Sequence, residues 1–437
     1  MALGGGKFVS QNKVLPGAYI NVASPSATAL TIADRGVVTM PVELDWGPDG
    51  EVFRVGVDDF NNDCLKLFGY ERGHEKMKPL RDLFRNTQTA YLYRLNGGVA
   101  AFCEYATAKY KGTRGNNIRI VIQKNADDET KYDVSTYLEN RKVDMQRVSA
   151  MTELIPNDYV VFKTDATITE VAGVSLTGGA NKDSIVAADY QAFLDRIESY
   201  SFNILACACT TEAINALFVE YTRRMRDDIG VKFQTVLYRA PDADHEGVIS
   251  LENKATGDGV PEASLVFWLA GAEASCDISK TIMNKVYDGE YTVDTDYTQA
   301  QLETGIAAGK LQLHSVGGSV RVLSDINTFV SFTEEKTSDF TQNQVIRVID
   351  DIANTTATIF NTKYLGVVTN NASGRISLWN DIVKRHKELE AGGAIENFNV
   401  DDIKIEQGES KRSVVVNEKV SIASSMTQLY MSVIVTV

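Results

Sequence analysis

The last ten residues constrain the fold of this chain more than any other feature of its sequence. Residues 428–437 alternate strictly between two faces and contain neither charge nor proline. Such alternation is typical of a β-strand. The apolar face consists of Leu429, Met431, Val433, Val435 and Val437. Because proteins normally protect a long apolar edge with charge or proline, we expect this strand either to insert into its own sheet or to pair with another subunit.

A second strand is predicted near the other end of the sequence. Residues 15–22 alternate, with Ile20 and Val22 on one face and Tyr19 on the other, which predicts a short strand. The preceding residues 1–13 contain a run of glycines and no apolar periodicity, so they predict a mobile arm. Both ends of the sequence therefore predict strands that have no local partner.

The composition predicts a folded protein of several domains. The 437 residues are 44% hydrophobic and 23% charged, as in globular chains, and at about 100–200 residues per domain they predict roughly three domains. The net charge of -14 would repel phosphate backbones and anionic lipids, so neither nucleic acid nor a membrane is an expected partner. The scattered, odd-numbered cysteines favour reduced thiols. With no secretion signal or membrane span in sight, we expect a cytosolic protein.

The order of predicted elements divides the chain into an α/β core with an inserted all-β module. Strands and helices alternate in 23–96 and again in 180–338, which predicts a discontinuous α/β middle domain. Residues 97–179 read as strands almost throughout, which predicts an inserted β-barrel or β-sandwich. In 339–427, helices precede strands and predict a C-terminal α/β domain. The predicted class is therefore multidomain, α+β or α/β.

Two of the predicted helices stand out, one for its apolar character and one for its charge. An apolar helix is predicted over Glu262–Lys285, and the last helix over Ser373–Glu390. The last helix carries the basic residues Lys384, Arg385 and Lys387. These cations either balance the helix dipole on a solvated face or form a docking patch for an acidic partner.

One acidic string has the pattern of a metal loop. Asp242, Asp244, Glu246 and Gly247 occupy the first, third, fifth and sixth positions of a calcium loop. The twelfth position, where such a loop needs a bidentate glutamate, is Asn253. A solvated loop between strands is therefore the favoured interpretation, and a calcium site is the alternative.

No other motif predicts chemistry. Cys207 and Cys209 lie in an apolar strand without the spacing of a redox pair or further zinc ligands. The four histidines lie in separate segments, and the glycine-containing turns lack the spacing of a phosphate loop. We therefore expect no catalytic residues, no cofactor and no bound metal.

Several blocks of the chain, taken in order, resemble contractile tail sheath proteins of myophages and phage-tail-like (R-type) bacteriocins. Residues 15–22 are similar to the Pro-Gly-Val-Tyr opening of that family, and residues 90–98 to its tyrosine-valine-arginine block. The other blocks are Trp46-Gly-Pro48, Leu67-Phe-Gly-Tyr70, Gly112 to Asn117, Asp244 to Val248, Arg321 to Phe329, Asn343 to Val348 and Leu429 to Met431. The resemblance spans nearly the whole chain and is greatest to the short sheaths of Gram-positive phages and prophages.

The resemblance implies a structural subunit that polymerises helically around an inner tail tube and contracts to drive the tube through a bacterial envelope. It implies that each copy lends an N-terminal and a C-terminal strand to a neighbour's sheet, completing the C-terminal α/β domain. The implied exchanged segments are an N-terminal arm, 1–22, whose strand 15–22 pairs through Tyr19, Ile20 and Val22, and the C-terminal strand 428–437, which pairs through Leu429, Met431, Val433 and Val435. These links would persist while the compact domains rotate.

The resemblance also implies partners and a location. Besides further copies of itself, the partners would be the inner tube protein and the baseplate and tail terminator proteins, with Lys384, Arg385 and Lys387 as candidate tube-facing residues. The protein would assemble in the cytoplasm of a bacterial host and end in a virion tail or tail-like particle. Two alternatives are a soluble α/β enzyme or calcium-binding protein using Asp242, Asp244 and Glu246, and another structural component of a phage tail.

Overall fold

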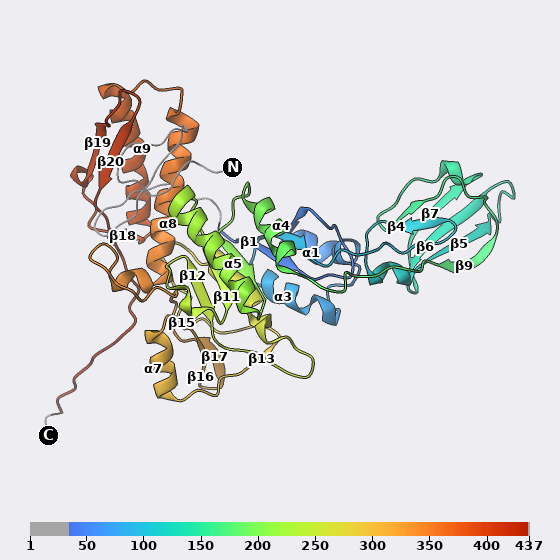
Figure 1. Ribbon diagram of the computed structural model, residues 1–437, viewed down its shortest axis with the longest axis horizontal. Coiled ribbons are helices and arrows are strands. Elements are labelled where there is room, and N and C mark those ends of the chain that lie inside the picture. The colour runs from blue at the N-terminus through green and yellow to red at the C-terminus, as the bar shows by residue number, and fades with distance from the viewer. Residues whose placement is uncertain (1–34, 436–437) are drawn as a thin grey trace. The chain divides into compact units, whose positions relative to one another are not determined.

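The computed structural model describes residues 35–435, which form two compact units (Figure 1). Residues 38–198 make up the first unit, and residues 35–37 together with 199–435 make up the second. Both units contain helices and strands, so the predicted mixed multidomain class is confirmed. Within 35–435, no helix has the length and apolar character that crossing a membrane requires.

The first unit contains a small α/β part. Strand β3 (Thr89–Arg94) lies between β1 (Val37–Val42) and β2 (Val52–Gly56), and it pairs with β2 in antiparallel orientation. The helices of this part are α1 (Val57–Asn62), α2 (Cys64–Phe68), α3 (Lys78–Phe84) and α4 (Ala187–Ile197). Phe60 of one helix, α1, stacks on Phe84 of another, α3, at 4.7 Å between ring centroids.

The rest of the first unit is the predicted all-β module. An antiparallel sheet has the order β7-β6-β5-β9, and a separate pair joins β4 to β8. Alternation along β5 places Ile118, Ile120 and Ile122 on one buried face, in one apolar cluster with Val160 and Phe162. The strands are β4 (Ala106–Ala108), β5 (Ile118–Lys124), β6 (Tyr132–Leu138), β7 (Arg141–Val148), β8 (Val160–Phe162) and β9 (Val171–Ser175).

Parallel strands form the centre of the second unit. Their order is β15-β12-β11-β10, and each pairs with its neighbour in parallel, which requires crossover connections. Helices α5 (Glu212–Arg223) and α6 (Leu265–Ser275) both pack against β11. The parallel strands are β10 (Ile204–Cys207), β11 (Gln234–Tyr238), β12 (Val248–Leu251) and β15 (Lys310–Leu311). The other elements of this region are α7 (Gln299–Ala307), β13 (Ala255–Thr256), β14 (Thr292–Val293), β16 (Leu313–Val316) and β17 (Ser319–Val322). We call residues 199–327 the central part.

Helix α6 is shorter than the sequence predicts. The expected helix reaches Lys285, whereas α6 ends at Ser275. Beyond it, the backbone N–H of Ile282 donates to Asp325 at 3.0 Å, and the carbonyl of Lys280 accepts from Arg347 at 2.9 Å. Backbone groups that serve distant side chains are not available to a helical ladder, so the prediction fails for a tertiary reason.

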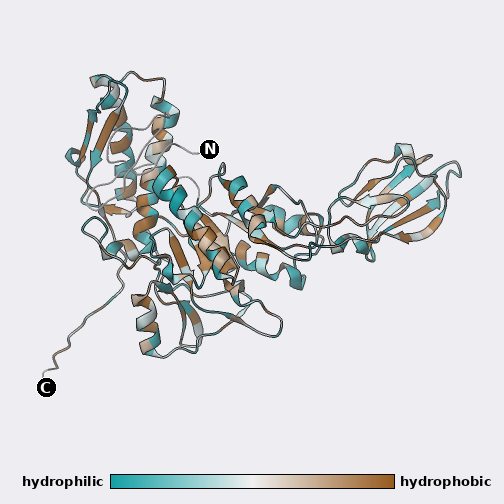
Figure 2. Cartoon of the chain, viewed as in Figure 1, coloured by the Kyte–Doolittle hydropathy of each residue, from teal (hydrophilic) through white to brown (hydrophobic). Residues whose placement is uncertain are grey.

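The C-terminal part, residues 338–422, packs two long helices against short strands. An apolar cluster includes Val348, Ile352, Ile382 and Leu389, and both helices mix hydrophobic with hydrophilic residues along their length (Figure 2). The helices are α8 (Asn343–Ile359) and α9 (Ala372–Ala391), and the strands are β18 (Ile395–Glu396), β19 (Ile403–Gln407), β20 (Val414–Glu418) and β21 (Ser421–Ile422). A short π-helix, Phe360–Tyr364, extends α8.

Candidate functional site

The C-terminal segment is the most exposed apolar feature among the described residues. Between 423 and 435 the chain forms neither helix nor strand, and it extends away from the rest of its unit (Figure 1). Leu429 is 86% exposed, Met431 75%, Val433 70% and Val435 77%. The segment therefore does not insert into a sheet of the described chain. The other predicted exchange residues, Tyr19, Ile20 and Val22, lie outside the described residues.

A two-stranded hairpin in the C-terminal part has the geometry of a strand acceptor. Strands β19 and β20 pair in antiparallel register from Ile403 with Glu418 to Gln407 with Val414. Apolar residues at alternate positions pack one face onto α9, where the Trp379 indole N–H donates to the Ile403 carbonyl at 3.1 Å. Among the described residues no third strand joins this sheet, so each strand has one outer edge open to β-addition.

A buried histidine fixes the hairpin to α9. His386 and Glu418 are both fully buried and form an ion pair through the imidazole Nε2. The His386 Nδ1 lies 3.1 Å from the carbonyl of Ile382, and its ring stacks on Phe398. Both ring nitrogens therefore lie against oxygen atoms, one of the Ile382 carbonyl and one of the Glu418 carboxyl. This contact holds the end of β20 against the helix.

The basic cluster of α9 is not one surface. Lys384 and Lys387 are exposed, whereas Arg385 is fully buried and pairs with Asp351 of α8 at 2.7 Å. The expectation of a tube-facing Arg385 is therefore wrong, because its guanidinium faces the helix pair. Lys384 and Lys387 remain candidates for a surface contact.

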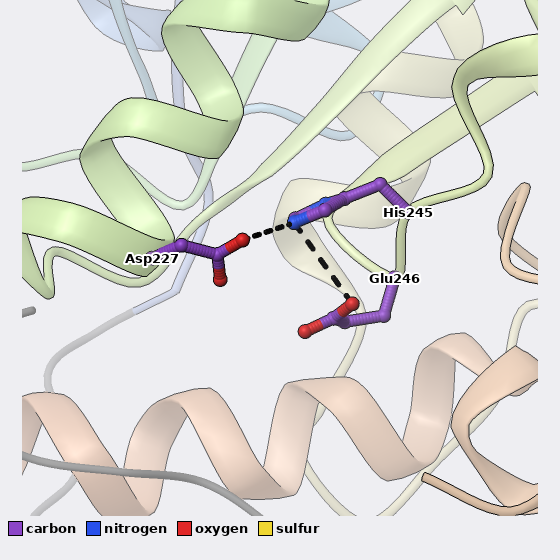
Figure 3. A group of neighbouring side chains, drawn as sticks. All are labelled: Asp227, His245 and Glu246. Carbon is purple, nitrogen blue, oxygen red and sulfur yellow. Dashed lines mark hydrogen bonds and ion pairs between the residues drawn. The ribbon is translucent and has the colours of Figure 1, made fainter. Parts of the chain in front are cut away.

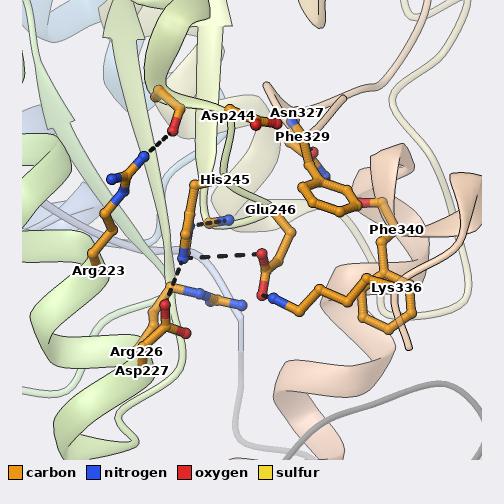
Figure 4. A network of polar contacts seen from close by, with 12 residues as sticks. Arg223, Arg226, Asp227, Asp244, His245, Glu246, Asn327, Phe329, Lys336 and Phe340 are labelled. Carbon is orange, nitrogen blue, oxygen red and sulfur yellow. Dashed lines mark hydrogen bonds and ion pairs between the residues drawn. The ribbon is translucent and has the colours of Figure 1, made fainter. Parts of the chain in front are cut away.

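The acidic string does not gather its carboxylates around one point (Figure 4). Asp242 is exposed. The Asp244 carboxylate accepts the N–H groups of Val330 at 2.8 Å and Ser331 at 3.0 Å, and Glu246 pairs with Lys336 at 2.5 Å. Since the carboxylates of Asp244 and Glu246 are each occupied by separate partners, Val330 and Ser331 for the first and Lys336 for the second, the calcium-loop alternative loses its geometric basis.

Only one group of described residues brings three metal-ligating side chains together, namely Asp227, His245 and Glu246 (Figure 3). The N–H of Gly247 donates to His245 Nδ1 at 2.9 Å, so the ring proton sits on Nε2, which lies 3.3 Å from Asp227 and 3.9 Å from Glu246. A nitrogen that carries a proton has no lone pair for a metal. The trio is therefore a network of polar contacts and does not fit a metal.

The charge of Glu246 is stabilised by its surroundings. Burial alone would raise its pKa, but His245, Arg226 and Lys336 outweigh burial and lower the pKa to about 2. Arg226 in turn makes two hydrogen bonds, of 2.6 and 2.8 Å, to Asp350 of α8. The acidic string thus belongs to a network that ends on a C-terminal helix.

A buried polar face of α8 was not predicted from the sequence. Asn343, Arg347, Asp350 and Asn354 follow one another at spacings of four, three and four residues, which puts them on one face. Each contacts the central part: Asn343 donates to Asp325 and Glu273, Arg347 pairs with both carboxyls, Asp350 with Arg226, and Asn354 with the backbone of Lys232. The spacing was the signal that could have revealed this face.

Two buried carboxyl groups share the charge of Arg347. Glu273 and Asp325 lie 2.5 and 2.7 Å from its guanidinium nitrogens, and all three side chains are almost completely buried. Burial, followed by the nearby Asp325, raises the pKa of Glu273 well above its ordinary value. For Asp325 burial is opposed by Arg347, which holds its pKa below the ordinary value. The two carboxyl groups beside this one guanidinium are therefore shifted in opposite directions.

Almost the whole described chain matches models of phage tail sheath domains. The central domain of phage tail sheath proteins matches residues 183–328, their C-terminal domain 335–436, their β-sandwich domain 96–181, and the N-terminal region of domain III of the tail sheath protein Gp18 matches 35–95. The chain belongs to the phage tail sheath family. It is therefore a structural sheath protein, and its place is in a virion tail or a tail-like particle.

Relatives of this sheath protein cover most of its length. It is 31% identical over 383 residues to the uncharacterized protein YqbK and 30% identical to the phage-like element PBSX protein XkdK, both of Bacillus subtilis, with 80% of this chain and 81% of each relative covered. A sheath tail protein of Desulfitobacterium hafniense is 33% identical with a TM-score of 0.81, covering 95% of this chain and 99% of that one.

A more distant structure shares the fold of the sheath protein. The contracted helical sheath of the anti-feeding prophage has a TM-score of 0.55 at 13% identity, with 97% of this chain and 99% of that chain covered. At this identity the likeness shows the fold alone. The mixed α/β architecture with its β-sandwich therefore extends to assembled sheaths.

Proposed function

We propose that this sheath subunit polymerises helically around an inner tail tube and that contraction of the polymer drives the tube through a bacterial envelope. The observation that carries the proposal is the C-terminal segment, whose apolar side chains between 429 and 435 are mostly exposed in the single chain. An exposed strand-forming segment of this length is an aggregation hazard unless a partner covers it. A neighbouring copy is the partner that the family membership favours.

The hairpin β19–β20 would receive the exchanged strands. One outer edge would accept residues 428–437 of a neighbour, and the other edge residues 15–22. Strand addition satisfies the open backbone groups of the hairpin and gives the alternating side chains pockets on alternate faces. The His386–Glu418 pair supports this role, because it holds β20 in place before the added strand arrives.

We further propose the domain division expected from the sequence. The middle domain would comprise 23–96 and 180–338, the outer β domain 97–179 and the C-terminal domain 339–427. An N-terminal arm, 1–22, with its exchanged strand and the C-terminal exchanged strand, 428–437, would flank them. The change from one family model to the next at residues 95, 181 and 328 supports this division. The proposed partners are the inner tube, baseplate and tail terminator proteins, and assembly would take place in the cytoplasm of the host.

Substitutions in the C-terminal segment test the proposal. A proline at Val433 removes a ladder N–H, and an aspartate there adds charge to the apolar face, so both Val433→Pro and Val433→Asp should leave a folded monomer that forms no tubes. Ser432→Asp, on the opposite face, is the matched control. It should still form tubes, although these can be fewer or shorter than those of the unmodified protein. Negative-stain electron microscopy of concentrated protein supplies the measurement. Normal tubes from Val433→Pro would contradict strand exchange.

A further inference from the structure

The acidic turn Asp244–Gly247, which does not fit a calcium site, has a different set of partners. It connects the short 3-10 helix Pro241–Ala243 to β12, so the parallel sheet fixes its position. Its contacts reach the segment 328–337, which we call the linker, and, through Arg226, helix α8. The linker joins the central part to the C-terminal part and contains no helix or strand.

Asp244 holds the first half of the linker. Its carboxylate Oδ1 accepts two consecutive backbone N–H groups, those of Val330 and Ser331, as a capping residue does at the start of a helix. Burial alone would raise the pKa of Asp244, but the hydrogen bonds from Ser331 and Val330 outweigh it and lower the pKa. A carboxylate that accepts N–H groups makes stronger hydrogen bonds than a neutral acceptor.

The next two residues hold the linker at both of its ends. The Thr328 hydroxyl accepts the N–H of His245 at 3.2 Å and donates to the carbonyl of His245 at 3.1 Å. Glu246 pairs with Lys336, and only 10% and 18% of these two side chains are exposed. Three consecutive residues of one turn therefore contact the linker at three separate points.

Gly247 extends the same turn toward α8. A Cβ at this position would lie 2.3 Å from the Cδ of Arg226, so the arginine passes directly over the glycine. Arg226 also donates to the carbonyl of Phe233 and pairs with Asp350, and its side chain is 3% exposed. The glycine thus leaves room for the cation that holds α8.

From these contacts we propose that Asp244–Gly247 is a latch, which fixes the linker and α8 to the central sheet and makes the central and C-terminal parts move as one body. A linker without secondary structure would otherwise be a flexible tether, because its backbone groups have few internal partners. In a contracting sheath, force that enters through the β19–β20 hairpin passes through this rigid link. The rigidity is a property of the single chain, and only the transmission of force rests on the proposed function.

Amide hydrogen exchange of the single chain tests the latch. In the unmodified protein the amides of Val330 and Ser331 should be protected, although they lie in a loop. In Asp244→Ala they should exchange faster by roughly tenfold or more for each hydrogen bond lost. Asp242→Ala removes the same charge two residues earlier, where the side chain is exposed, and should leave the protection unchanged. Asp244→Asn, which keeps an acceptor oxygen, should fall between the two.

Unprotected amides in the unmodified protein, or unchanged protection in a folded Asp244→Ala variant, would overturn the latch. If Asp244→Ala does not fold, Lys336→Met tests the second anchor, because it keeps the aliphatic stem and removes the ion pair with Glu246. It should accelerate exchange across 333–337, and no acceleration would likewise overturn the proposal.

Electron microscopy of assembled tubes tests the transmission of force separately. In tubes of Asp244→Ala, residues 343–418 should no longer follow the helical symmetry of the tube. In tubes of Asp242→Ala, they should. Equal order in both would refute the mechanical role of the latch. Failure of the unmodified protein to form tubes would refute the proposed assembly and would leave the exchange result standing.

Discussion

The two sides of helix α8 are held in place by opposite kinds of interaction. One side contributes Val348, Ile352 and Ile359 to the apolar cluster it shares with α9. The other side presents Arg347 and Asp350, which pair with carboxyls and a guanidinium of the central part. Apolar packing is non-directional and tolerates volume-conserving changes. A buried ion pair requires one geometry and loses its balance when one partner is removed.

The difference suggests a division of roles within the second unit. The apolar side stabilises the C-terminal part by the area it removes from water. The ionic side adds less net stability, because desolvation offsets its attraction, but it specifies how α8 is oriented. A subunit that carries load benefits when the orientation of α8 is fixed. Substitutions at three positions, taken from the largest expected effect to the smallest, test the comparison.

The largest effect is expected on the ionic side. Arg347→Met keeps much of the side-chain volume but leaves Asp325 buried without its cation, so the free energy of unfolding should fall by about 3–5 kcal/mol. The control is Lys363→Met, which breaks the pair with Asp381 through a lysine side chain that is 54% exposed and should cost less than about 1 kcal/mol. Urea denaturation supplies the measurement. Equal losses in the two variants would contradict the proposed importance of burial.

A smaller loss is expected on the apolar side. Ile352 is 4% exposed in the cluster between α8 and α9, so Ile352→Ala should lower the free energy of unfolding by roughly 2–4 kcal/mol through lost burial and a cavity. Ile352→Val should cost only about 1 kcal/mol. Neither variant should increase amide exchange at residues 325–331, which lie on the other side of α8. Faster exchange there would show that the two sides of α8 are not independent.

The smallest effect depends on pH and concerns Glu246. Its pKa in the folded protein is about 2, below the ordinary value of about 4.3, so its stabilising contribution is complete above about pH 5. As the pH falls through 4 toward 2, roughly 2 kcal/mol of stability should be lost. Glu246→Gln should be less stable at pH 7 and should lose less stability on acidification. Acid titrations of the two proteins, followed by circular dichroism, supply the measurement, and curves of the same shape would refute this role.

Local patterns predicted the elements that depend mainly on neighbouring residues. The helix expected over Ser373–Glu390 is α9, Ala372–Ala391, because its 3.6-residue periodicity reflects one continuous apolar contact. The strands expected within 97–179 likewise include β5, Ile118–Lys124, whose buried face packs within a single module. The resemblance of collinear blocks to tail sheath proteins, which the family models confirm, was also readable from the residues alone.

The sequence by itself determined the strand-like pattern of residues 428–437, because alternation and missing charge are local properties. Only the tertiary structure decided that α6 stops at Ser275 and that Arg385 is buried. It also decided that Asp244 caps a linker 86 residues further along the chain. The reason is the same in each case, because these outcomes depend on hydrogen bonds and charges from segments far away in the sequence. A local helical or acidic pattern does not show which distant residues will contact it in the folded protein.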